Sequence, residues 1–144
     1  MTAFFDLSNS SIVFPELIGG VIIGPDGEIG RQSMPTLADT ALLAPPLICH
    51  RRWTEARLNI TLERAFDVLE LYAFMRSARF CLPTPTGLAL RLGLPRPQSN
   101  EQRAMIIGQA THILLDELTE KSQTEQGRIA GLAEMMRRGG WAWG

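Results

Sequence analysis

The hydrophobic pattern changes near residue 50, and this change constrains the fold more than any other feature of the sequence. Before it, short apolar and β-branched runs are separated by glycine, proline and Asp-Gly, which is typical of strands and turns. After it, apolar residues recur with the period of a helix. Strands first and helices later indicate an α/β or α+β fold, with a small sheet from the first 50 residues packed by helices from the rest.

The strand-like part predicts a hairpin. In PELIGGVIIGPDGEIG, residues 15–30, an apolar run reaches a Pro-Asp-Gly turn and continues beyond it. A strand in AFFDL, residues 3–7, and another in PPLIC, residues 45–49, would complete the sheet. A short helix is expected between them at residues 36–43.

The helical part begins with TLERAFDVLELYAFMRSA, residues 61–78, which is apolar on most sides and is therefore expected to be a buried helix. Thr61 is its expected N-cap. Asp67 and Glu70 stand one turn apart, and Arg64 is placed to neutralise Asp67.

Three more helices are expected towards the C-terminus. The first is short, with Thr84 or Thr86 as its N-cap and Gly93 as its stop. The second, at residues 100–118, is the clearest long helix of the sequence. The third spans residues 123–138. The tail GGWAWG carries Trp141 and Trp143. We interpret these rings as packing on a neighbour, unless the polypeptide continues.

Composition narrows the class of protein. With 144 residues, 45% apolar and 20% charged, the chain has the composition of one soluble domain with a real core. It contains no apolar run approaching the roughly 20 residues that span a bilayer and no basic-then-hydrophobic leader, so we expect a cytoplasmic protein without a membrane partner. Cys49 and Cys81 lack metal-site spacing and are expected to be buried, reduced thiols.

The net charge of −1 argues against a strongly polyanion-seeking protein, but the charge is uneven. Residues 51–103 carry nine arginines against five acids, so any nucleic-acid contact is expected there. Trp53 could supply a ring on which a base stacks. The alternative, that these are ordinary solvated arginines, stays open. The candidate binding residues are Arg51, Arg52, Trp53, Arg57, Arg76 and Arg79, with Arg91, Arg96 and Arg103 as further cations.

A family resemblance adds to this reading. The succession FFDL, GPDGEIG, PPLICHRRWTEARL, AFDVLELYAF, PTGLALRLGL and QRAMIIGQATHILLDEL resembles the DEDD-type exonuclease domain of the ribonuclease H-like fold. It covers most of residues 4–118 and is closest in the last of these segments. YAFMRSARFCLPTPTGLALRLGLP and RRGGWAWG are similar to the N-terminal region of alphaproteobacterial DinG-like ATP-dependent DNA helicases, where a degenerate exonuclease-like domain precedes the motor.

The resemblance implies an α/β, ribonuclease H-like domain over residues 1–120. Residues 121–144 would then be a C-terminal helix and tail leading toward a helicase motor absent from this chain.

The resemblance also implies a degenerate active site. Enzymes of that family hold a pair of divalent ions between carboxylates. Here Asp6 could stand at the first carboxylate position, whereas Ser8 takes the place of the Glu. Glu55 falls near a later Asp position. In the last helix Gln102 replaces the general-base His, and Ile107 replaces an Asp. The resemblance therefore implies no catalytic residue and no metal site. A phosphate-cradling G-x-x-x-x-G-K-[ST] segment is also missing, so ATP and magnesium are expected only in a downstream motor.

Together these features predict a non-catalytic N-terminal module of an ATP-dependent DNA helicase, with a structural or DNA-positioning role. Its expected partners are single-stranded DNA and a helicase motor in cis. An active metal-dependent 3′–5′ exonuclease remains one alternative. A standalone interaction protein that docks through Trp141 and Trp143 is the other.

Overall fold

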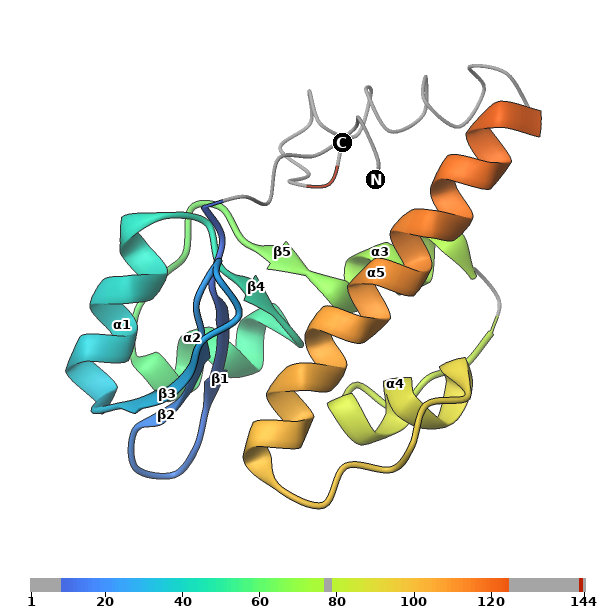
Figure 1. Cartoon of the computed structure of the whole chain (residues 1–144). Coiled ribbons are helices and arrows are strands. Elements are labelled where there is room, and N and C mark those ends of the chain that lie inside the picture. The colour runs from blue at the N-terminus through green and yellow to red at the C-terminus, as the bar shows by residue number, and fades with distance from the viewer. Residues whose placement is uncertain (1–8, 77–78, 125–142, 144) are drawn as a thin grey trace.

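The computed structural model describes residues 9–76, 79–124 and 143 (Figure 1). The strand predicted at residues 3–7 and most of the helix predicted at residues 123–138 lie outside these ranges. Within the described residues the chain is a mixed α/β structure, in which helices pack on a five-stranded sheet (Figure 1). No helix in this described part is long and apolar enough to cross a membrane.

The sheet is mixed, with the order β3-β2-β1-β4-β5. β2 runs antiparallel to both β1 and β3, whereas β4 runs parallel to both β1 and β5. The predicted hairpin is confirmed as the β2–β3 pair, but β5 comes from beyond residue 50, so the sheet does not arise from the first 50 residues alone. The strands are β1 (Ile12–Pro15), β2 (Gly20–Ile23), β3 (Ile29–Gln32), β4 (Leu47–Ile48) and β5 (Phe66–Asp67).

Local capping signals set several helix ends. Ser33 caps α1, and Thr84 caps α4 by accepting a hydrogen bond from the Gly87 amide at 3.0 Å. α4 ends at Gly93, whose φ of 71° is the left-handed conformation that glycine adopts readily. The helices are α1 (Met34–Leu43), α2 (Arg51–Leu58), α3 (Val68–Met75), α4 (Pro85–Leu92) and α5 (Asn100–Thr124).

The helix predicted at residues 61–78 is wrong in its first half. α3 begins only at Val68, and its N-cap is Asp67 rather than Thr61. The Asp67 carboxylate accepts hydrogen bonds from the backbone amides of His50, Arg51 and Leu69 at 2.8–3.0 Å, and not from the Arg64 side chain. Three amides use its lone pairs, so Asp67 joins the end of β4 to the start of α3.

The core lies on both faces of the sheet. Alternate residues of β1 face opposite ways: Phe14 joins a cluster with α3, α4 and α5, while Val13 joins a smaller cluster with α1 and the loop before β5. Leu62 and Ala65 fill this smaller cluster. These two apolar side chains therefore anchor a loop to the core and do not mark the start of a helix.

Trp143 packs against the chain's own core. Its side chain is 0% exposed, its ring centroid lies 5.0 Å from that of Phe66, and its indole Nε1 donates to the Asp67 carbonyl oxygen at 2.7 Å. The prediction that this ring packs on a neighbour or docks on a partner is therefore wrong. Trp141 lies outside the described residues.

Candidate functional site

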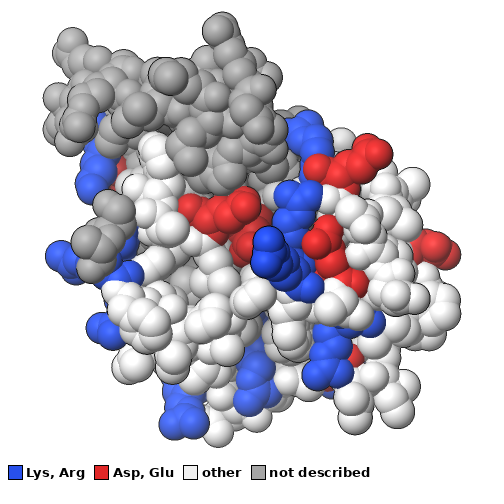
Figure 2. All heavy atoms as spheres, turned by 180° about the vertical axis from the view of Figure 1, so that it is seen from behind, with Lys and Arg blue, Asp and Glu red and all other residues white. Residues whose placement is uncertain are grey.

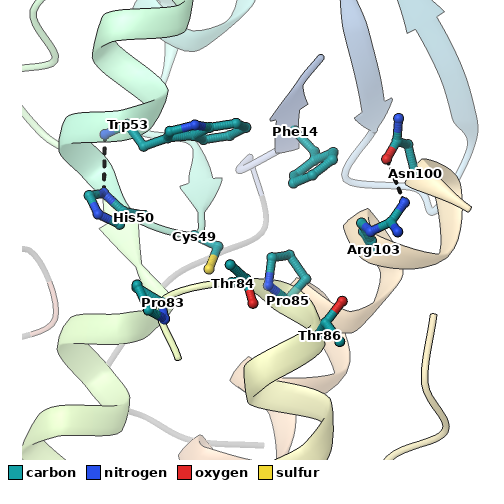
Figure 3. Close-up of a pocket in the computed structure, with 10 residues that line it drawn as sticks. All are labelled: Phe14, Cys49, His50, Trp53, Pro83, Thr84, Pro85, Thr86, Asn100 and Arg103. Atoms are coloured by element: carbon teal, nitrogen blue, oxygen red, sulfur yellow. Dashed lines mark hydrogen bonds between the residues drawn. The ribbon is translucent and has the colours of Figure 1, made fainter. Parts of the chain in front are cut away.

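A cavity of about 510 Å³ opens where β1 and β4 end (Figure 3). These two strands are parallel neighbours, and ligands of open α/β sheets bind in the crevice beyond the carboxyl ends of such strands. Residues from β1, α2, α4 and α5 meet there. The lining residues are Phe14, Cys49, His50, Trp53, Pro83, Thr84, Pro85, Thr86, Asn100 and Arg103.

One side of this pocket is an aromatic wall. The rings of Trp53 and Phe14 lie 5.8 Å apart between centroids with an interplanar angle of 34° (Figure 3). The Arg57 guanidinium lies 5.4 Å from the Trp53 ring centroid, within the range of a cation–π contact. Trp53 is only half-buried, so part of its ring remains available to a ligand.

A sharp turn after β4 places Trp53 in this wall. His50 adopts a φ of 70°, an unusual conformation for a side-chain-bearing residue, and caps α2. Its Nδ1 accepts a hydrogen bond from the Trp53 amide at 3.1 Å, and its own amide donates to Asp67. The Asp67 contact therefore helps to hold the turn that aims Trp53 at the pocket.

The opposite wall is the segment Pro83–Thr86, which leads into α4 (Figure 3). Gly87 lets this segment lie close to the preceding loop, because a Cβ at Gly87 would collide with the carbonyl oxygen of Leu82. Two prolines and a side-chain cap make this wall stiff.

The side across from Cys49 and His50 is polar and comes from the first turns of α5 (Figure 3). Arg103 Nη1 donates to Asn100 Oδ1 at 2.8 Å, and Asn100 Nδ2 donates to Glu16 Oε2 at 2.5 Å. Glu16 Oε1 accepts from Arg31 Nη1 at 2.6 Å. The hydrogen bond from Arg31 lowers the pKa of Glu16 against the raising effect of burial, and Asn100 adds to the lowering. Glu16 therefore stays ionised.

The thiol in the pocket wall is not activated. Burial raises the pKa of Cys49 well above its usual range, and the Asp67 carboxylate adds to this. Cys81 is only half-buried, contrary to prediction, and its pKa is also raised by burial. Neither thiol has the depressed pKa of a nucleophile.

Those predicted degenerate positions that the structure describes do not line this pocket. Asp6 and Ser8 lie outside the described residues. The Glu55 carboxylate instead accepts a hydrogen bond from the Leu62 backbone amide at 2.7 Å. Gln102 Oε1 accepts from the Gln98 amide at 2.6 Å, and Ile107 is buried in the core. Residues 9–76, 79–124 and 143 contain no group of three or more His, Cys, Asp or Glu side chains that could hold a metal ion.

The candidate nucleic-acid residues divide between two places. On α2, Trp53 lines the pocket with Arg57 against its ring, and Arg52 is exposed. Arg51 is engaged within the protein, because its guanidinium donates to the carbonyl oxygen of Leu62 and lies 3.6 Å from the Glu55 carboxylate.

Arg76 and Arg79 line a different hollow, beside Glu117 at the other end of the structure's longest helix. Arg76 forms an ion pair with Glu117 there. Figure 2 shows Lys and Arg side chains interspersed with Asp and Glu on the face opposite to that of Figure 1. On the described part of that face the Lys and Arg side chains lie in separate groups and form no single stripe.

Sequence reasoning missed Phe14 and Asn100 as pocket residues. Asn100 and Arg103 are three residues apart on α5 and so share one face. The helical periodicity of the sequence could therefore have placed Asn100 beside Arg103. Phe14 was missed because the strand at Ile12–Pro15 was not predicted.

No family model matches this chain, and comparisons with curated proteins and with solved structures find no match either.

Proposed function

We propose that this chain is a ribonuclease H-like module that binds single-stranded DNA without cleaving it. In this proposal it positions the strand for an ATP-dependent DNA helicase motor in the same polypeptide. The observation that carries the DNA-binding part is the aromatic wall of Trp53 and Phe14 in a pocket at the ends of two parallel strands.

The sheet supports the finer fold assignment. Its order is β3-β2-β1-β4-β5, β2 alone runs against the others, and helices cover both faces. This arrangement is the one expected of a ribonuclease H-like sheet, and the resemblance to exonuclease domains implied the same fold.

The aromatic wall supports single-strand binding. Every base has a π face, so a half-exposed tryptophan can stack on an unpaired base whatever the sequence, contributing about 1–3 kcal/mol per base. The Arg57 guanidinium beside the Trp53 ring adds a positive charge that could attract a phosphate backbone. A duplex would hide its bases from this ring.

What the pocket presents supports binding rather than cutting. Its described lining consists of two aromatic rings, two prolines, hydroxyls, a thiol, an imidazole, an amide and a guanidinium. Paired divalent ions need converging carboxylates, and the nearby carboxylates of Glu16 and Asp67 are engaged by Arg31, Asn100 and backbone amides.

Binding of labelled oligo(dT) of about ten nucleotides, followed by fluorescence anisotropy at low salt, tests the proposal. Trp53→Leu is expected to weaken binding about tenfold or more, since it removes the stacking ring but leaves an apolar side chain. Phe80→Leu is the matched control, because Phe80 is 68% exposed and does not line the pocket. Equal affinities of wild type and Trp53→Leu would rule out this site.

Two further measurements separate the alternatives. Nucleotide release from the same oligonucleotide on adding magnesium or manganese would favour the exonuclease. A reading frame that continues past Gly144 into a phosphate-binding loop would support the helicase assignment, and a stop codon there would oppose it.

A further inference from the structure

We propose that Arg103 recognises the phosphate of the bound nucleotide, and that Asn100 and Glu16 are positioning residues that hold its guanidinium at the pocket without neutralising it. This inference rests on the proposed function. It adds which part of the nucleotide is recognised and by which residue.

The side-chain partner of the Arg103 guanidinium is a neutral amide and not a carboxylate. Arg103 Nη1 donates to the amide oxygen of Asn100 at 2.8 Å, and no salt bridge in the described part of the chain includes Arg103. The remaining N–H donors of the guanidinium are therefore left for an anion. Because a guanidinium presents parallel donors, it matches the oxygens of a phosphate.

The orientation of Asn100 is fixed from its other end. Asn100 Nδ2 donates to Glu16 Oε2, so the amide oxygen is the end that faces Arg103. Glu16 itself is held by Arg31 and is only 14% exposed at its side chain. The negative charge of Glu16 is thus compensated by Arg31, and Asn100 separates it from Arg103.

Other arginines of the chain show the contrast. Arg31 lies between the carboxylates of Glu16 and Glu101, and Arg76 pairs with Glu117. Arg51 is used by Glu55 and by a backbone carbonyl. Arg103 instead combines a neutral partner with a place in the pocket lining.

The pocket geometry matches a flat ring joined to an anion. Figure 3 shows the Trp53 and Phe14 rings lying together, with Arg103 and Asn100 on the side across from Cys49 and His50. A base against the rings would leave its sugar phosphate to reach Arg103. Thymidine monophosphate, thymidine and inorganic phosphate are therefore the informative probes.

The test compares the affinities of these three probes by NMR titration. Wild type is expected to bind thymidine monophosphate about tenfold more tightly than thymidine, and inorganic phosphate more weakly than the nucleotide. Arg103→Gln should remove the tenfold preference and leave thymidine binding unchanged. Arg64→Gln, an exposed arginine that does not line the pocket, should keep the preference.

Variants of Asn100 separate positioning from mere structure. Asn100→Asp places a carboxylate against Arg103, so it should abolish the phosphate preference. Asn100→Ala keeps the charge of Arg103 but removes the group that orients its guanidinium. It should therefore reduce the preference for thymidine monophosphate over thymidine only partly. With oligo(dT), Arg103→Gln should also lower the slope of log affinity against log salt by about 0.7, as expected for one lost phosphate contact.

Each outcome decides something. Equal binding of thymidine and its monophosphate, or a preference that survives Arg103→Gln in a folded variant, overturns this inference and leaves the stacking pocket intact. Equal effects of Asn100→Ala and Asn100→Asp overturn the positioning role. If neither the probes nor oligo(dT) binds, the proposed function and this inference fail together.

Discussion

Asp67 and Arg103 are both charged residues close to the ends of the parallel strands, but they differ in how far other groups of the protein satisfy their hydrogen-bonding capacity. Asp67 is 5% exposed, its carboxylate accepts hydrogen bonds from three backbone amides, and its carbonyl oxygen accepts one from the Trp143 indole. Arg103 is half-buried and contacts one neutral amide oxygen. The first charge is fully satisfied within the protein, and the second is left with free donors.

The difference separates two uses of a buried or half-buried charge. A carboxylate surrounded by backbone amides ties segments together, because removing it leaves those amides without partners. A guanidinium with a neutral partner contributes less to folding and more to recognition. Changes around Asp67 should therefore affect the free energy of unfolding, and changes around Arg103 should affect ligand binding.

The largest expected effect is that of Asp67→Ala. It removes the α3 N-cap and orphans the amides of His50 and Arg51, so we expect it to lower the free energy of unfolding by about 4 kcal/mol. Urea denaturation measures this loss. Asp39→Ala, an exposed position on α1, is the control and should stay within about 0.5 kcal/mol of wild type. A similar loss in both variants would mean that Asp67 is not a structural junction.

Trp143→Ala should cost about 3 kcal/mol, because it empties a site in the core beside Phe66. Trp143→Phe should cost only about 1 kcal/mol, since it keeps a ring and loses the hydrogen bond to the Asp67 carbonyl. Thermal unfolding of the whole chain measures both. If the thermal unfolding midpoint of Trp143→Ala were unchanged, the ring would not stabilise the core, and docking on a partner would again be the better explanation.

Features with local causes could be predicted from the sequence. The Pro-Asp-Gly turn of the β2–β3 hairpin was one, with Gly27 at a φ of 87°. The ends of α4 were another: Thr84 was one of two predicted caps, and the stop at Gly93 is confirmed. The long helix was confirmed too, although α5 continues to Thr124, beyond the predicted end at residue 118. In each case the residues that set the structure lie next to it in the chain.

Features with tertiary causes could not be predicted. β5 spans two residues, too few for a pattern, and it exists because β4 lies beside it. The strand predicted at residues 45–49 is confirmed only as the two residues of β4, which lies between β1 and β5. α3 starts late because Phe66 and Asp67 pair with β4, and the preceding Leu62 packs in the core cluster with α1. Trp53 was predicted to offer a stacking ring to nucleic acid, but the pocket that it shares with Phe14 and Asn100 forms only in the assembled fold.

Gly87→Ala tests whether the pocket wall is as tightly set as the Asp67 junction. A methyl group there would collide with the Leu82 carbonyl, so the wall must shift, and we expect a loss of about 2 kcal/mol. The wall carries Pro85 into the pocket, so oligo(dT) binding should weaken as well. Gly30→Ala is the control, since its methyl group would meet only Ile22 Cγ2 at 3.8 Å. Unchanged binding in a destabilised Gly87→Ala would show that this wall does not contact the ligand.

The smallest expected effect comes from Arg31→Gln, which tests whether the contact between Arg31 and Glu16 contributes to the positioning of Arg103. The pKa of Glu16 in the folded chain lies below its unfolded value, chiefly because Arg31 donates to it. The pair therefore stabilises the fold above the unfolded pKa of Glu16, and this contribution is lost as the pH falls through the lower folded pKa. Arg31→Gln should lower the urea midpoint slightly at about pH 7, and the difference should shrink as the pH falls through the folded pKa of Glu16.

The same change should weaken thymidine monophosphate binding, because an uncompensated Glu16 carboxylate would draw Arg103 toward itself. Arg64→Gln serves as the control in both measurements. A midpoint difference that is constant with pH would assign Arg31 a packing role alone. Unchanged nucleotide affinity would separate Glu16 from the positioning of Arg103, leaving Asn100 to hold the guanidinium by itself.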